Sequence, residues 1–276
     1  MDGDSADASV AIAEAAGLLV VRHDTRGRAA AINRGVQEAT APIICVLHAD
    51  TLLPDDAVAV MRRVLADPGT ALAGFTPLLS GPDQVHWGTS FHNWIKTWYA
   101  PLVFRPQLFL RGLRLLFGDH AMFFRRADFL AVGGCDPTLL VMEEADLCIR
   151  FHRLGRTRLV NRVVITSDRR VAAWGALRAN WIYLKVGARW GLGFRKGLER
   201  GCLAGLAGTG VAAIPGHRFG RCRRAGRLPR WRATAPRGRR GGCGCSASTA
   251  TAAIAAGRGP RRRPRTRSGR GISRGC

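Results

Sequence analysis

The residue types that could do chemistry in this chain begin with Asp50. This carboxylate follows the apolar run Pro42–Leu47, with His48 between them. A continuous apolar run of this length is typical of a parallel strand that is buried on both faces. Ligands of open α/β sheets lie just beyond the carboxyl ends of such strands. The pattern therefore places Asp50 where a metal ion or a phosphate-bearing ligand would bind, with N-capping of the next helix as its alternative role.

Four further polar clusters lie at the ends of predicted elements. They are Asp2-Gly3-Asp4-Ser5 with Asp7, Gly27-Arg28-Ala29 with Asn33, Gly118-Asp119-His120, and Glu143-Glu144-Ala145-Asp146. Each has a plain structural explanation, because Asp and Ser are ordinary N-caps and an acidic first turn favours the helix dipole. Taken singly, none of them identifies a functional site.

Glycine, proline and apolar spacing predict alternating strands and helices that would position these residues. The predicted strands are 18–21, 42–47, 71–75, 121–124 and 159–166. Predicted helices end at Gly17, span Ala29 to Val36, run from Pro54 to near Gly69, cover 143–154 and begin again after Ala176. This alternation predicts an α/β fold with a mostly parallel sheet and helices on both faces.

Read in order, the clusters resemble those of the family-two glycosyltransferases, which have the GT-A fold and use a nucleotide-sugar donor. The segments that carry the resemblance are MDGDSAD, RGRAAAINRG, IICVLHADTLLP, GDHAMFFRR with GGCDP, and LVMEEADLCIRFHRLGR. They look most like a subgroup described as arsenosugar-biosynthesis transferases. The resemblance covers about residues 1–200, which we treat as one domain.

The resemblance implies a donor side for this domain. Asp2 and Asp4 fall in the turn that contacts the base and ribose of the nucleotide, and Arg28 and Asn33 match the region that closes over it. Asp50 matches the metal-binding carboxylate at the strand end. His48 takes the place of a second carboxylate there. A divalent ion at this place, Mg²⁺ or Mn²⁺, would neutralise the diphosphate leaving group.

The same resemblance implies an acceptor side. Gly118 and Asp119 match the acceptor loop, in which His120 replaces the usual Gln. Glu143 and Glu144 match the acidic pair that supplies the catalytic base. The second member is usually Asp, so Glu144 carries the base one methylene further out. A carboxylate suits this role, because the acceptor hydroxyl must lose its proton as it attacks the anomeric carbon.

Two arginines beyond the last predicted strand have two readings. Arg169 and Arg170 could help the departing phosphate, or they could form a solvated basic patch, which is the reading we favour.

The main departure from the family is at the N-terminus. The family begins with a strand, a helix and a second strand before the acidic turn, whereas here Met1 stands directly before that turn. We therefore expect a GT-A sheet that lacks its first two strands, with unpaired strand edges and impaired donor binding. A gene model truncated at the N-terminus and frameshifted near Gly216 would account for both ends of the sequence.

The charge of +24 is concentrated in the C-terminal region. Residues 217–276 hold 18 Arg and no Lys, Asp or Glu, which leaves 25 basic and 19 acidic residues in the rest of the chain. We expect 201–216 to be a short apolar linker and 217–276 to be a disordered tail, because the tail has few large apolar side chains. The tail is either an arm for nucleic acid or anionic membrane, or GC-rich DNA read in a wrong frame.

Composition suggests a cytoplasmic or peripheral membrane protein. The first residues are acidic and unlike a signal peptide. No apolar run reaches membrane-spanning length. The aromatic and basic segment 94–117 predicts either contact with a membrane surface or a helix that covers the active site, and we favour the second.

Three functional hypotheses follow from the sequence. The first is an inverting, metal-assisted glycosyltransferase that moves a hexosyl group from a nucleotide-sugar to an acceptor hydroxyl. The second is an inactive remnant of such an enzyme. The third is a nucleic-acid-binding protein that acts through its Arg-rich tail.

Overall fold

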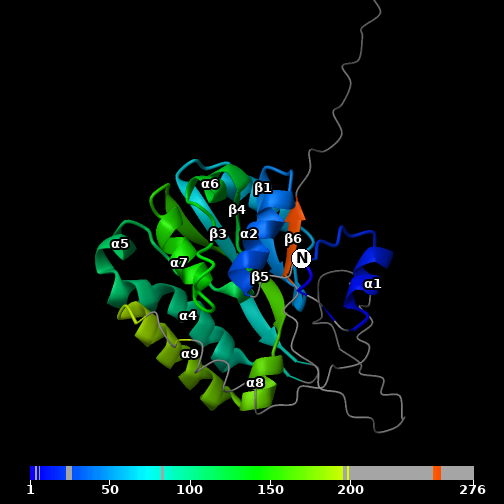
Figure 1. The fold of residues 1–276 in the computed structure, drawn as a ribbon. Helices are drawn as coiled ribbons and strands as arrows, with labels where there is room; N and C mark the ends of the chain where they lie inside the picture. Colours follow the sequence, from blue (N-terminus) through cyan, green and yellow to red (C-terminus); the bar gives the residue numbers. More distant parts are fainter. Residues whose placement is uncertain are drawn as a thin grey trace, which may run out of the picture.

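Helices pack on both faces of a central sheet (Figure 1). This computed structural model describes residues 1–3, 5, 7–22, 27–81, 84–194, 198 and 251–255. The strands are β1 (Ile43–His48), β2 (Thr51–Leu52), β3 (Thr70–Ser80), β4 (Phe123–Arg125), β5 (Arg156–Ser167) and β6 (Thr251–Ala255). The helices are α1 (Ser9–Ala15), α2 (Arg28–Glu38), α3 (Ala57–Leu65), α4 (Trp87–Phe104), α5 (Pro106–Leu110), α6 (Arg126–Ala131), α7 (Glu143–Phe151), α8 (Arg169–Trp174) and α9 (Ala176–Gly191), with a 3₁₀ turn η1 at Gly118–His120.

The two faces of the sheet carry separate hydrophobic cores. Side chains alternate between the faces of a strand, so neighbours such as Phe123 and Phe124 of β4 point to opposite sides. Phe124 and Ile44 belong to a core with α2, α6 and α7, whereas Phe123 and Cys45 belong to one with α3. This arrangement confirms the predicted α/β fold with helices on both faces, as in the GT-A fold.

The strand directions differ from the prediction. The order is β2-β5-β3-β4-β1-β6, and among these strands only the β3–β5 pairing is parallel. The prediction of a mostly parallel sheet was wrong in this respect, because the short strand β4 lies antiparallel between β1 and β3. Apolar runs show that a strand is buried but carry no information about the direction of its neighbours.

The edge of β1 is also arranged differently from the prediction. Leu18–Val21, which we expected to be a strand, forms none, and its neighbour Arg22 makes a single bridge to Asp2. Instead β6 pairs antiparallel with β1 along its length. Within the predicted tail 217–276, the described residues are 251–255, a Thr-Ala-Ala-Ile-Ala segment without Arg that forms this strand. Residues 201–250 and 256–276, which include the predicted linker, lie outside the described residues.

Within the described part of the chain, no helix has the length and apolar character needed to cross a membrane. The predicted helix after Ala176 is confirmed as α9, and the aromatic helix is confirmed as α4. Helices α4 and α9 lie side by side and cover the region below α7 in Figure 1.

Candidate active site around Glu144

A buried cation joins the two carboxylates that begin α7. Arg28, the first residue of α2, places Nε 2.5 Å from Glu143 Oε1 and Nη2 2.6 Å from Glu144 Oε1. The glutamate side chains are 1% and 3% exposed, and that of Arg28 is 21% exposed. Residues 115 positions apart in the sequence thus form one charged cluster. We call Arg28, Glu143 and Glu144 the carboxylate cluster.

Gly118 brings the carboxylate cluster to the strand end. A Cβ atom added at Gly118 would lie 2.5 Å from His48 Nε2 and 2.8 Å from both Arg28 Nη1 and Glu144 Oε1. His48 ends β1, and its Nε2 lies 3.3 Å from Arg28 Nη1. Glycine is required here because the ends of three functional side chains converge on its Cα. Five of the predicted site residues therefore meet at one point.

The charges of the cluster do not balance, and the pKa values of Glu144 and His48 are shifted as a result. One guanidinium faces two buried carboxylates, so one negative charge remains poorly compensated. Burial, together with the charge of Glu143, raises the pKa of Glu144 to about 7, although Arg28 works against this shift. Burial and the charge of Arg28 lower the pKa of His48 to about 4, so its imidazole is neutral at pH 7.

Two buried oxygens of the cluster lack a hydrogen bond from the described residues, and one of them, Glu144 Oε1, is ion-paired with Arg28. Glu143 Oε2 is buried and has no hydrogen-bond partner among the described residues. A buried carboxylate oxygen without a partner is costly, and such atoms mark places where a water or substrate hydroxyl binds. The backbone also bends sharply here, because Met142 just before Glu143 has a positive φ of 66°. Ala121, just after η1, has a φ of 43°. Strain of this kind is common at functional sites.

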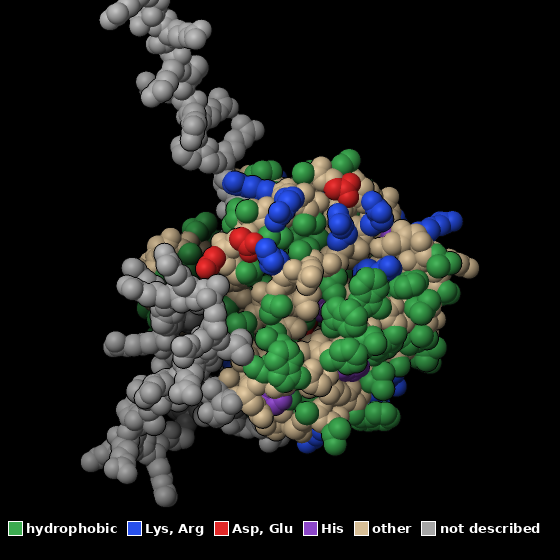
Figure 2. Space-filling model, turned by 180° about the vertical axis from the view of Figure 1, so that it is seen from behind, with side chains coloured by type: hydrophobic (Ala, Val, Ile, Leu, Met, Phe, Trp, Pro, Cys, Tyr) green, Lys and Arg blue, Asp and Glu red, His purple; other side chains and the backbone are tan. Residues whose placement is uncertain are grey.

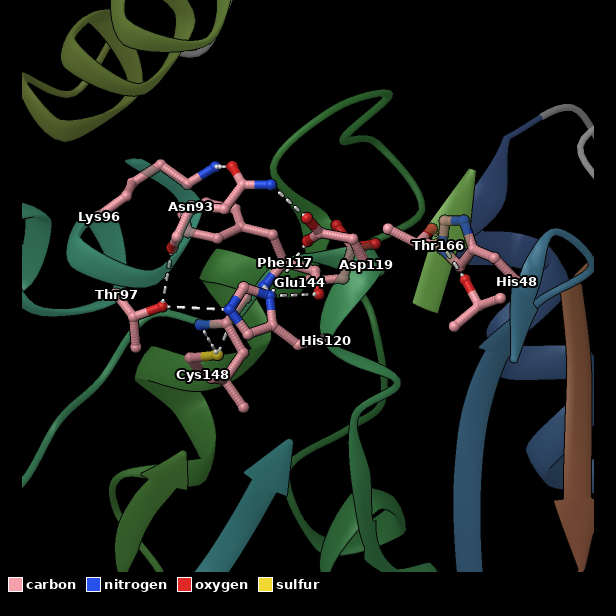
Figure 3. Close-up of polar contacts among 12 residues, drawn as sticks. His48, Asn93, Lys96, Thr97, Phe117, Asp119, His120, Glu144, Cys148 and Thr166 are labelled. Atoms are coloured by element: carbon pink, nitrogen blue, oxygen red, sulfur yellow. Dashed lines mark hydrogen bonds and ion pairs between the residues drawn. The ribbon is translucent and has the colours of Figure 1, made fainter. Parts of the chain in front are cut away.

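Helix α4 holds the acceptor-side loop η1 through a polar network (Figure 3). Asn93 donates from Nδ2 to Asp119 Oδ2 at 2.5 Å and accepts at Oδ1 from Lys96 Nζ at 3.0 Å. Thr97 Oγ1 lies 3.2 Å from Nε2 of the buried His120. These three α4 residues are site residues that the sequence reading missed. Their signal was present, since they are polar residues at helical spacing in an otherwise aromatic helix.

The network keeps a second negative charge close to the carboxylate cluster. Burial alone would raise the pKa of Asp119, but the His120 ring and Lys96 outweigh it and hold that pKa well below its ordinary value. Burial lowers the pKa of Lys96, and the charges of Asp119 and Glu144 oppose that shift. Lys96 Nζ also lies 3.9 Å from the centre of the Phe117 ring. The site therefore contains fixed charges of both signs around Gly118.

Asp50 lies in the turn after β1 and is partly exposed. Its Oδ2 is 2.7 Å from Nη2 of Arg169, which begins α8. Arg170 is exposed, and its charge acts on His48. Of the two arginines for which sequence analysis favoured a solvated basic patch, Arg169 is thus the ion-pair partner of Asp50 at the strand end.

The residues present fit a metal ion only in part. The described residues contain no group of three or more His, Cys, Asp or Glu side chains able to hold one. Asp50 and the neutral His48 supply two suitable donor atoms. Mg²⁺ is commonly held by one or two carboxylates together with substrate phosphates, so a two-donor site completed by a diphosphate is chemically reasonable.

The remaining predicted donor residues have local contacts. Asp2 accepts hydrogen bonds from Ser5, and its backbone N–H donates to Val21. Asn33 uses its side-chain amide to hold the backbone of Cys135, with distances of 2.7 and 2.8 Å. Asp4 lies outside the described residues. Nucleotide contact by Asp2, Asp4 and Asn33 stays a prediction.

Comparison with known proteins gives a match to a family over part of the chain. Residues 1–133 match the model of glycosyl transferase family 2, a range that includes Arg28, His48, Asp50 and Gly118. None of the curated proteins matches the chain. Solved structures similar to it include the mannosyltransferase PcManGT from Pyrobaculum calidifontis in complex with GDP-Man and Mn²⁺. That structure is 16% identical, with a TM-score of 0.49, over 77% of this chain. The match spans 66% of the mannosyltransferase chain. Residues 1–133, a little under half of the chain, are thus similar to glycosyl transferase family 2.

Proposed function

We propose that this protein is an inverting glycosyltransferase that moves a hexosyl group from a nucleotide-diphosphate donor to an acceptor hydroxyl. The observation that carries this proposal is the buried carboxylate cluster at Gly118. Glu143 and Glu144 lie beyond the part that matches the family, yet Arg28 and Gly118 within that part contact Glu144. The similarity of residues 1–133 to glycosyl transferase family 2 supports glycosyl transfer, and the cluster supplies a suitable base.

Glu144 is placed to accept the acceptor proton. With a pKa of about 7, it is substantially deprotonated at neutral pH and basic enough to take a proton from a reacting hydroxyl. As the bond from the acceptor oxygen to the anomeric carbon forms, the bond from that carbon to the diphosphate breaks. The nucleoside diphosphate leaves on the opposite side, which inverts the configuration. Arg28 holds the carboxylate of Glu144 in place and limits its charge.

The strand end would receive the leaving diphosphate. Arg169 and Arg170 supply positive charge there, and Asp50 and His48 would hold a divalent ion together with the phosphate oxygens. When bound, such an ion would neutralise charge that develops on the leaving group. Asp50 would then exchange its ion pair with Arg169 for the metal, which frees Arg169 for the phosphates.

Donor turnover tests this function. We expect the protein to release nucleoside diphosphate from at least one of a panel of UDP-, GDP- and dTDP-sugars in the presence of Mn²⁺. Chelation with EDTA is expected to reduce the rate by about tenfold or more, and so is the substitution Asp50→Asn. The matched control is Asp56→Asn, since Asp56 forms an exposed ion pair with Arg162.

Two results would contradict the proposal. If the wild-type protein turns over no donor in the panel, the enzyme reading fails for those donors and the inactive-remnant hypothesis is favoured. If turnover occurs but neither EDTA nor Asp50→Asn affects it more than Asp56→Asn does, the metal-assisted part is wrong.

A further inference from the structure

Helices α4 and α9 form a layer whose outer side is unusually apolar. The two helices are held together by side-chain hydrogen bonds from Asn180, which lies 2.9 Å from His92 Nδ1 and 3.4 Å from Thr89 Oγ1. Arg105, just after α4, donates to the carbonyl of Gly191 at the end of α9. The pair is therefore joined at both ends.

Each helix carries one exposed apolar stripe. The residues are Trp87, Phe91 and Trp94 on α4, and Leu177, Trp181 and Leu184 on α9. Both stripes have the i, i+4, i+7 spacing of a single helix face. Their exposure is high, with Trp87 at 67%, Trp181 at 65% and Leu177 at 89%. Figure 2 shows hydrophobic side chains gathered over the side of the molecule where α4 lies. We call these six residues the α4/α9 apolar face.

Every charged residue in the segments that form this layer is basic. Residues 84–118 and 169–194 contain nine Lys or Arg and no Asp or Glu. Seven of them are exposed, namely Arg169 and Arg170 at the start of α8 and a further five: Arg105, Arg111, Arg178, Lys185 and Arg189. None of these five forms an ion pair with another of the described residues. The surface of an ordinary soluble protein mixes positive and negative charges. Because these segments carry positive charges alone, they favour an anionic partner.

We propose that the α4/α9 apolar face is a docking surface for an anionic lipid bilayer. Trp side chains are favourable at the interface between headgroups and acyl chains, and leucines bury apolar area just below it. Basic residues near the surface of an anionic membrane add electrostatic attraction to it. A second copy of the chain fits less well, because two such faces would bring like charges together without any carboxylate to offset them.

Docking through this face would bring the bilayer close to the candidate active site. The inner side of α4 carries Asn93 and Thr97 to Asp119 and His120 of the acceptor-side loop. The outer side of the same helix carries Trp87, Phe91 and Trp94. A bilayer on the outer side would thus lie one helix away from the acceptor-side loop. Helix α4 accordingly serves both purposes that the sequence suggested for segment 94–117.

Sedimentation of the full chain with vesicles tests the proposal. The probes are phosphatidylcholine vesicles with and without about 30% phosphatidylglycerol at physiological salt. The variant Trp87→Gln/Trp181→Gln is expected to bind the anionic vesicles about tenfold or more weakly than the wild type. Arg178→Glu/Lys185→Glu is expected to lower the preference for phosphatidylglycerol. The control Leu19→Gln/Leu154→Gln replaces exposed apolar residues elsewhere and is expected to leave binding unchanged.

All variants keep residues 201–276, so the C-terminal arginines contribute equally to vesicle binding by each variant. If the Trp87→Gln/Trp181→Gln variant binds as tightly as the control, the membrane affinity comes from another part of the chain and the proposal fails. It also fails if the wild type does not bind vesicles but forms a dimer by light scattering that this variant abolishes. Because the substituted side chains are exposed, thermal melting is expected to be the same for all variants.

Discussion

Replacing Glu144 by glutamine is expected to slow donor turnover by about 10²- to 10⁴-fold, the usual contribution of a general base. Glutamine has nearly the same shape but cannot accept the acceptor proton. The Michaelis constant for the donor is expected to change little, because the donor side that we propose lies at Asp50 and Arg169. Steady-state rates of nucleoside diphosphate release measure this effect.

The same substitution is expected to preserve or raise stability at pH 8. The pKa of Glu144 is raised in the folded state, so its ionised form is less favourable there than in the unfolded chain. Glutamine resembles the protonated form and removes this penalty. A loss of activity without a loss of melting temperature therefore distinguishes a catalytic role from a structural one. Asp146→Asn on the same helix is the matched control. A Glu144→Gln protein that turns over the donor as fast as the wild type would exclude Glu144 as the base.

Replacing Arg28 by methionine is expected to lower the free energy of unfolding by about 3–5 kcal/mol at pH 8, because it leaves two buried carboxylates without their cation. Without Arg28, the pKa of Glu144 rises further in the folded state, because Arg28 is the charge that lowers it. The folded protein then holds protons that the unfolded chain releases, so stability is lost as the pH rises. The deficit is accordingly expected to be smaller at pH 5, as measured by urea denaturation at both pH values.

Arg34→Met provides the matched control on the same helix. Arg34 pairs with Glu38 across one helical turn, with side chains 54% and 39% exposed, and such pairs contribute less than about 1 kcal/mol. Adding Glu143→Gln and Glu144→Gln to Arg28→Met is expected to restore most of the lost stability. The account of the cluster fails if Arg28→Met costs no more than Arg34→Met, or if its cost is the same at pH 5 and pH 8.

Local patterns of residue types in the sequence predicted the strands and helices that carry the site residues. The apolar run before His48, the glycine before Arg28 and the acidic start of α7 each place a polar residue at the end of an element. The structure confirms these positions as β1, α2 and α7. The family resemblance assigned these residues to the donor and acceptor sides of one site, but their convergence on Gly118 was not predicted, since spacing along the chain contains no information about which loops meet.

Other features depend on tertiary contacts that a sequence does not show. The direction of β4 depends on its two neighbours, and the pairing of β6 with β1 joins segments about two hundred residues apart. The Arg28 ion pairs were missed because Arg28 was considered only as a nucleotide contact. Asn93, Lys96 and Thr97 were missed because the aromatic character of α4 dominates its sequence.

The pH dependence of donor turnover tests the central claim, that Glu144 in the carboxylate cluster is the base. Only its deprotonated form accepts a proton, so kcat/KM is expected to rise about tenfold per pH unit at low pH and to level off above about pH 7. His48, with a pKa of about 4, and Asp119, with a lower pKa still, add no step in this range. The residual activity of Glu144→Gln is expected to lack the rise. A wild-type profile that is flat from pH 5.5 to 8, or a rise that persists in Glu144→Gln, would contradict the account.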